Sequence, residues 1–132
     1  MNPRPMKILV VDDFELGRER IRIALREMGF DDEWIEDAED GTDALSSLRA
    51  AATALAPFEL IFSDWNMPQM SGLELLKQCR ADAQLKNVLF VMVTSEAEQP
   101  NVIEALRSGA NDYLTKPITN DTFAAKVRKL LR

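Results

Sequence analysis

The sequence contains no histidine and a single cysteine, Cys79. A Cys/His zinc site therefore cannot be assembled and no internal disulfide can form, which fits a reducing cytoplasm. No apolar stretch approaches the roughly 20 residues that span a bilayer, and the amino-terminal MNPRPMK lacks the apolar region of a signal peptide. We therefore expect a soluble, cytoplasmic protein.

Basic residues are also in the minority. Sixteen Lys and Arg residues face 22 Asp and Glu residues, for a formal net charge of −6 at pH 7. This charge repels phosphate backbones and anionic membrane surfaces, so neither nucleic acid nor a membrane is an expected partner. The five glycines are scattered, and no GxxxxGK(S/T) loop is present to cradle a nucleotide.

The chain has the size and apolar content of one domain, with 132 residues of which 46% are hydrophobic. Continuous apolar runs suit strands that are buried on both faces of a parallel sheet, and they occur at 7–11, 58–62, 88–93 and 112–114. Segment 33–38 is a weaker strand candidate, near a sheet edge.

Helical patterns lie between these runs. Ile21, Leu25 and Met28 repeat at i, i+4 and i+7, and Gly29 and Gly109 occupy positions typical of helix C-caps. Strand and helix thus alternate five times, which predicts a doubly wound α/β sandwich with right-handed crossovers.

Two further helical segments carry specific expectations. The Ala-rich segment 46–57 predicts an extended second helix, and Ser71 is placed to cap the helix that begins near Gly72. Basic side chains near the end of the last helix favour the negative end of its dipole, with partner contact as the alternative: Lys126, Arg128, Lys129 and Arg132.

Polar side chains follow the predicted strands. Asp12 and Asp13 come after the first strand, Asp64 after the third, Thr94 after the fourth and Lys116 after the fifth. The carboxyl ends of parallel strands meet at one edge of a sheet, where open α/β folds place their sites. We therefore expect these side chains to lie close together.

Three gathered carboxylates repel one another unless a cation neutralises them. Oxygen ligands without histidine favour Mg²⁺, which keeps open positions for a phosphoryl oxygen. Lys116 and Thr94 add the charge and the hydrogen-bond donor that phosphoryl transfer requires. A carboxylate can itself form an aspartyl phosphate, and a chain without histidine would need an external donor.

Four motifs, in order and with matching spacing, resemble the receiver domain of two-component response regulators: VVDD (10–13), SDWNMPQMSGLELL (63–76), MVTSE (92–96) and YLTKP (113–117). The resemblance covers essentially the whole chain and is greatest to single-domain chemotaxis regulators. It implies one receiver domain over residues 1–132. The implied fold is a flavodoxin-like (βα)5 sandwich with a five-stranded parallel sheet in the order 2-1-3-4-5.

The resemblance also implies the site residues. Asp64 would be the phosphoacceptor and would take a phosphoryl group from a histidine kinase, with Mg²⁺ as cofactor. Asp13, Asp64 and the backbone carbonyl of Asn66 would bind Mg²⁺ directly, and Asp12 would bind it through water.

Switching roles follow from the same resemblance. Lys116 and Thr94 would contact the phosphoryl group, and Thr94 would move toward it while Tyr113 follows inward. Asn66 and Glu96 would tune dephosphorylation and give a relatively short-lived phosphorylated form.

The expected output surface comprises the fourth helix, fifth strand and fifth helix, about residues 98–131. Its favoured partner is a flagellar motor switch protein, although another protein target is open, and we expect a monomer. In this family the Lys116–Pro117 peptide is often cis.

Other functions stay open at this point. One alternative is a receiver excised from a larger regulator, and another is a phosphorelay intermediate. A haloacid-dehalogenase-like Mg²⁺ hydrolase would need a DxD arrangement and a cap, whereas Asp12 and Asp13 are adjacent and 132 residues leave no cap. A phosphorylation-independent interaction domain would typically have lost some of the residues that are intact here.

Overall fold

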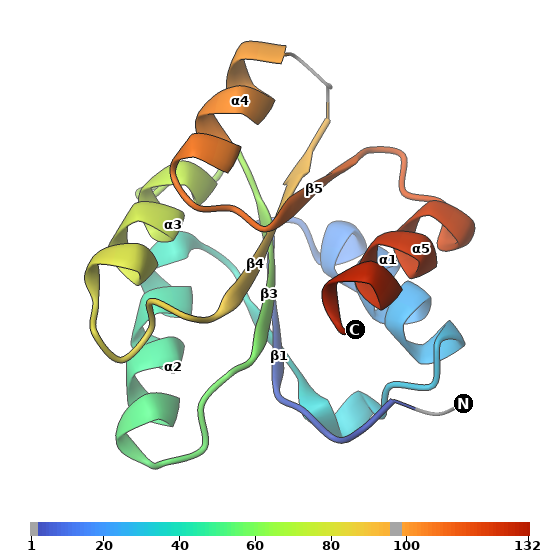
Figure 1. Cartoon of the computed structure of the whole chain (residues 1–132), viewed down its shortest axis with the longest axis horizontal. Coiled ribbons are helices and arrows are strands. Elements are labelled where there is room, and N and C mark those ends of the chain that lie inside the picture. Colours follow the sequence, from blue (N-terminus) through green and yellow to red (C-terminus); the bar gives the residue numbers. More distant parts are fainter. Residues whose placement is uncertain (1–2, 96–98) are drawn as a thin grey trace.

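In the computed structural model, residues 3–95 and 99–132 are described, and strands alternate with helices along them (Figure 1). A short 3-10 helix, Asp32–Trp34, precedes the second strand. The elements are β1 Ile8–Val11, α1 Glu15–Glu27, β2 Ile35–Ala38, α2 Gly41–Thr53, β3 Leu60–Asp64, α3 Gly72–Ala81, β4 Leu89–Thr94, α4 Gln99–Arg107, β5 Asp112–Thr115 and α5 Asn120–Leu130.

The strands form one parallel sheet in the order β2-β1-β3-β4-β5, which confirms the predicted fold class and places the weak strand β2 at an edge. The register pairs Asp64 with Val93 and Thr94 with Thr115. Strands β3, β4 and β5 therefore end almost level, and the polar residues at their carboxyl ends are brought to one edge of the sheet.

Helices cover both faces of the sheet, with α2, α3 and α4 on one side and α1 and α5 on the other (Figure 1). Alternate residues of each strand contribute to the two cores: Leu9 and Ile61 pack toward α2 and α3, whereas Leu60 and Phe62 pack toward α1 and α5. The central strands β1, β3 and β4 are buried on both faces, which explains why their sequences are continuous apolar runs.

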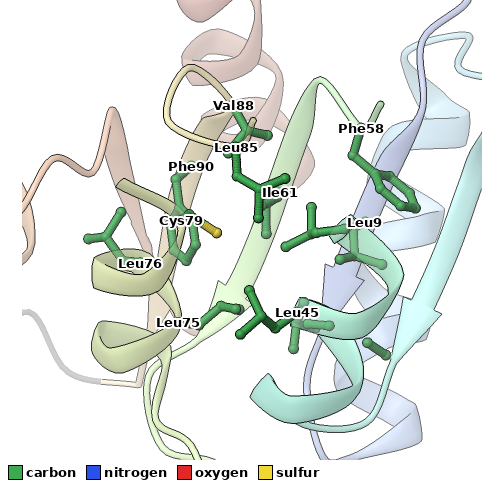
Figure 2. Packing of buried hydrophobic residues seen from close by; sticks show 14 of the residues in the cluster. Leu9, Leu45, Phe58, Ile61, Leu75, Leu76, Cys79, Leu85, Val88 and Phe90 are labelled. Carbon is green, nitrogen blue, oxygen red and sulfur yellow. The ribbon is translucent and has the colours of Figure 1, made fainter. Parts of the chain in front are cut away.

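The core under α2 and α3 is closely packed, as Figure 2 shows for Leu45, Leu75 and Cys79. Cys79 is completely buried, and this burial raises the pKa of its thiol to about 11. At neutral pH it is therefore a protonated, inert thiol that packs as a small hydrophobic residue. None of the helices in the described part of the chain is long and apolar enough to cross a membrane.

The expected helix caps are confirmed. Gly29 and Gly109 have φ angles of 96° and 108°, a region that glycine enters without steric cost. The Ser71 hydroxyl accepts a hydrogen bond of 3.1 Å from the backbone N–H of Glu74 and so caps α3.

The prediction of a helix through residues 46–57 is wrong at its end, because α2 stops at Thr53. Leu55 adopts a φ of 61° and donates its N–H to the Ala52 carbonyl, while Ala56 donates to Ala51. These two bonds make a Schellman motif, which ends the helix. Glycine is the usual residue at the left-handed position, so Leu55 gives no sequence signal for this stop.

Candidate functional site

An acidic cluster lies at the carboxyl edge of the sheet. Asp12 and Asp13 directly follow β1, and Asp64 is the last residue of β3. One carboxylate oxygen from each of the three residues lies within 4.8 Å of the other two. Asp12 and Asp64 are buried and Asp13 is exposed, so the cluster is open to solvent from one side. The structure thus brings together the three acids expected from the sequence.

Lys116 bridges the two buried carboxylates. Its Nζ lies 3.4 Å from Asp12 Oδ2 and 3.3 Å from Asp64 Oδ1. The Lys116 backbone N–H donates a 2.8 Å hydrogen bond to the carbonyl of Thr94, which fixes the start of the segment after β5. The Lys116–Pro117 peptide is cis, as the resemblance implied.

The environment of Asp64 raises the pKa of its carboxyl above the ordinary value. Burial is the largest cause; the attraction of Lys116 opposes it, and repulsion from Asp12 adds to it. A hydrogen bond of 3.0 Å from the Trp65 N–H to Asp64 Oδ1 favours the ionised form. The carboxylate is therefore held at a cost that a bound cation would reduce.

The turn after β3 holds Asp64 against the sheet. The Trp65 N–H also reaches the Val93 carbonyl at 3.1 Å, and the Gly72 N–H donates to the Trp65 carbonyl at 2.8 Å. A Cβ at Gly72 would overlap the backbone carbonyl of Asp64. Only glycine allows the start of α3 to approach the phosphoacceptor candidate this closely.

Asp12 is held in a similar way. Its Oδ1 accepts a 2.9 Å hydrogen bond from the Phe14 N–H, and its own N–H donates to the Ala38 carbonyl of β2 at 3.1 Å. A Cβ at Gly17 would overlap Asp12 Oδ2, so the first turn of α1 is in direct contact with this carboxylate.

Of the remaining predicted residues, Thr94 is buried at the end of β4, whereas Asn66 is exposed in the loop between β3 and α3. Tyr113 is half-buried in β5 and packs on the α2, α3 and α4 side of the sheet. Their roles in binding and switching stay predictions. Glu96 lies outside the described residues.

Two functional candidates were missed or misread in the sequence. Lys126 does more than balance the α5 dipole: its Nζ lies 4.0 Å from the centroid of the Tyr113 ring and 3.2 Å from Asp112. The interpretation of Lys126 as a side chain that serves only the dipole at the helix end is therefore wrong, and no pattern in the local sequence indicates its contact with Tyr113. Arg18 reaches the Asp12 carbonyl, and nothing in the local sequence indicates this.

The donor set suits a hard divalent cation. The acidic cluster offers only oxygen atoms, from strands that are adjacent in the sheet, and leaves one side open. Mg²⁺ prefers a few carboxylates together with retained waters, so Asp12, Asp13 and Asp64 fit this ion.

Comparison with known proteins identifies the family. Residues 8–128 match the response regulator receiver domain. The chain is 41% identical over 125 residues to chemotaxis protein CheY-3 of Vibrio cholerae, covering 95% of this chain and 91% of that protein. It is 42% identical over 125 residues to chemotaxis protein CheY of Pseudomonas aeruginosa, with 95% of each covered. The solved structure of V. cholerae CheY4 is 31% identical, with a TM-score of 0.81 over 96% of this chain and 98% of that one. The chain therefore belongs to the response regulator receiver domain family, with chemotaxis proteins of the CheY type among its relatives.

Proposed function

We propose that this chain is a phosphorylation-activated signalling switch in which Asp64 accepts a phosphoryl group from the phosphohistidine of a histidine kinase. The observation that supports this most strongly is Lys116 Nζ, placed 3.3 Å from Asp64 Oδ1 beside the three-aspartate cluster. An ammonium group at this point can contact an oxygen of a phosphoryl group carried by Asp64.

In the proposed transfer, an Oδ atom of Asp64 attacks phosphorus and forms an O–P bond. The P–N bond to the donor imidazole breaks, and its electron pair stays on the nitrogen. Water later attacks the same phosphorus, the P–O bond to Asp64 breaks, and inorganic phosphate leaves as the carboxylate is restored. Asn66 and Glu96 are proposed to tune this second step.

The receiver-domain family uses Mg²⁺ at this acidic pocket. Here Asp13, Asp64 and the backbone carbonyl of Asn66 would hold Mg²⁺ directly, and Asp12 would hold it through water. When bound, it supplies positive charge to the phosphoryl oxygens.

The phosphoryl group adds about two negative charges and three acceptor oxygens to the edge of the sheet. Lys116 and the buried Thr94 are the groups proposed to close on it, and Tyr113 is proposed to follow Thr94 inward. The phosphoryl group shifts the switch only by the difference in its interaction with the two conformations. The contacts of Lys116 and Thr94 would supply that difference.

The proposed output is control of flagellar motor rotation through the surface of α4, β5 and α5. A motor switch protein, or another protein target, would bind there, while the kinase would approach the acidic cluster. We further propose that residues 1–132 act as a single receiver domain, as a monomer in the cytoplasm.

Trp fluorescence tests this proposal. Trp65 follows Asp64 directly, whereas Trp34 lies before β2 and packs on Phe30 with a ring-centroid distance of 6.2 Å. In a Trp34→Phe background, we expect Mg²⁺ to change Trp65 emission and beryllofluoride, a phosphoryl mimic, to cause a further saturable change. The beryllofluoride change should disappear in Asp64→Asn.

The matched control is Glu27→Gln, which removes an exposed carboxylate at the distant end of α1 and should respond like the parent. A folded parent protein that responds to neither ligand would contradict the proposal. A full beryllofluoride response in Asp64→Asn would show that another residue is the acceptor.

A further inference from the structure

Arg18 links α1 to the acidic edge of the sheet. Its Nη1 donates a 2.8 Å hydrogen bond to the backbone carbonyl of Asp12, and its Nε forms an ion pair of 3.3 Å with Asp37 Oδ2 of β2. The side chain is only 11% exposed although it is charged. A largely buried guanidinium fork with two fixed partners has a well-defined orientation.

Asp37, the ion-pair partner of Arg18 in β2, is itself held in place. Arg22 Nε lies 2.8 Å from Asp37 Oδ1, so both oxygens of Asp37 accept from arginine side chains of α1. The Asp12 N–H donates to the carbonyl of Ala38, the residue after Asp37. The backbone of Asp12 is thus held at its N–H by β2 and at its carbonyl by Arg18.

We propose that Arg18 is a positioning residue for the metal site. The carbonyl it holds belongs to the peptide group that joins Asp12 to Asp13, and the rotation of this peptide sets where both carboxylates point. By fixing it, Arg18 keeps the two carboxylates and Asp64 at the spacing that a single cation needs. This inference rests on the proposed binding of Mg²⁺ to the cluster.

Arg18 could affect Mg²⁺ binding through its positive charge or through the orientation it gives to the Asp12–Asp13 peptide. These two causes predict opposite effects on Mg²⁺ affinity when Arg18 is removed. If Arg18 acted as a nearby positive charge, its removal would strengthen Mg²⁺ binding, because like charges repel. Asp37 already pairs with the guanidinium and offsets its charge, so we expect the orienting hydrogen bond to be the larger contribution. Removal of Arg18 therefore weakens Mg²⁺ binding.

The experiment compares Mg²⁺ affinities of Arg18→Met and Arg18→Lys by Trp65 fluorescence in the Trp34→Phe background. Arg18→Met should bind Mg²⁺ about tenfold more weakly, the lower end of the cost of losing a group that orients metal ligands. Arg18→Lys keeps the charge, but its single ammonium cannot reproduce the fork, so it should also bind more weakly. Arg26→Met removes an arginine of the same helix that pairs with Glu19 and Asp32 and does not contact Asp12 or Asp37, so this variant should bind like the parent.

Two further readouts separate positioning from general destabilisation. Thermal unfolding in EDTA should show that both Arg18 variants are folded at the titration temperature. The amide nitrogen of Asp13 follows the hydrogen-bonded carbonyl, so its NMR chemical shift should move in Arg18→Met without metal and stay in place in Arg26→Met.

An Arg18→Met protein that binds Mg²⁺ as tightly as the parent, or more tightly, would overturn the positioning role while leaving the proposed function intact. A parent protein that does not bind Mg²⁺ at all would overturn both.

Discussion

Replacing Lys116 with methionine removes the ammonium group between two buried carboxylates while keeping most of the aliphatic side chain. The two contacts, 3.3 and 3.4 Å long, are each worth about 1.2 kcal/mol at the dielectric constant of water and about 5 kcal/mol at an effective constant of 20. The Lys116 side chain is 32% exposed, which favours the lower value. After discounting for screening, we expect Lys116→Met to lose about 1–2 kcal/mol of stability at pH 7 in EDTA.

Saturating Mg²⁺ should reverse much of this loss, because a divalent cation would then neutralise the same carboxylates. Any loss recovered in Mg²⁺ must appear as tighter Mg²⁺ binding by the variant, about fivefold for each 1 kcal/mol. Urea unfolding of parent and variant in EDTA and in Mg²⁺ measures the first quantity, and Trp65 titration measures the second. An equal loss in both buffers, with unchanged Mg²⁺ affinity, would refute the view that Lys116 and the metal compensate the same charges.

Three further predictions concern single residues. Burial raises the pKa of Asp64, so the folded protein binds more protons than the unfolded chain and loses stability as pH rises above about 3.9; in EDTA, Asp64→Asn should be more stable than the parent at neutral pH, and a gap that stays constant down to pH 3 would contradict this. Leu55 has a φ of 61° and is 90% exposed, so Leu55→Gly should gain about 0.5–1 kcal/mol in urea unfolding, whereas Leu55→Ala, which keeps the Cβ, should not. Gly17→Ala would drive a Cβ into Asp12 Oδ2, so Mg²⁺ titration should show weaker binding even though alanine is the better helix former by about 1 kcal/mol.

The sequence predicts the centre of the sheet well because β1, β3 and β4 are buried on both faces. Continuous apolar runs such as 88–93 are typical of such strands, and their short length favours a strand over a helix; β4 spans Leu89–Thr94. The acidic cluster follows from the same logic, since parallel strands place the residues at their carboxyl ends on one edge. Asp12, Asp13 and Asp64 could therefore be grouped before the structure was known.

What escaped prediction depends on contacts between distant parts of the chain or on backbone conformation. Arg18 and Asp37 are 19 residues apart, and their pairing requires the crossover from α1 to β2 to be in place. Lys126 reaches Tyr113 only once Phe123 and Val127 of α5 have packed into the same core as Leu114 of β5. The end of α2 depends on the left-handed backbone conformation of Leu55, which a leucine at this position does not predict.

The role of Asp64 as phosphoacceptor can be tested without a partner protein, by measuring the mass of the intact protein. Incubation with a small acyl phosphate lets the Asp64 carboxylate attack phosphorus while the acyl carboxylate leaves, so no kinase is required. We expect one added phosphoryl group in the wild type with Mg²⁺, and none in EDTA or in Asp64→Asn. A folded wild type that gains no phosphoryl group, or an Asp64→Asn variant that gains one as readily, would contradict it.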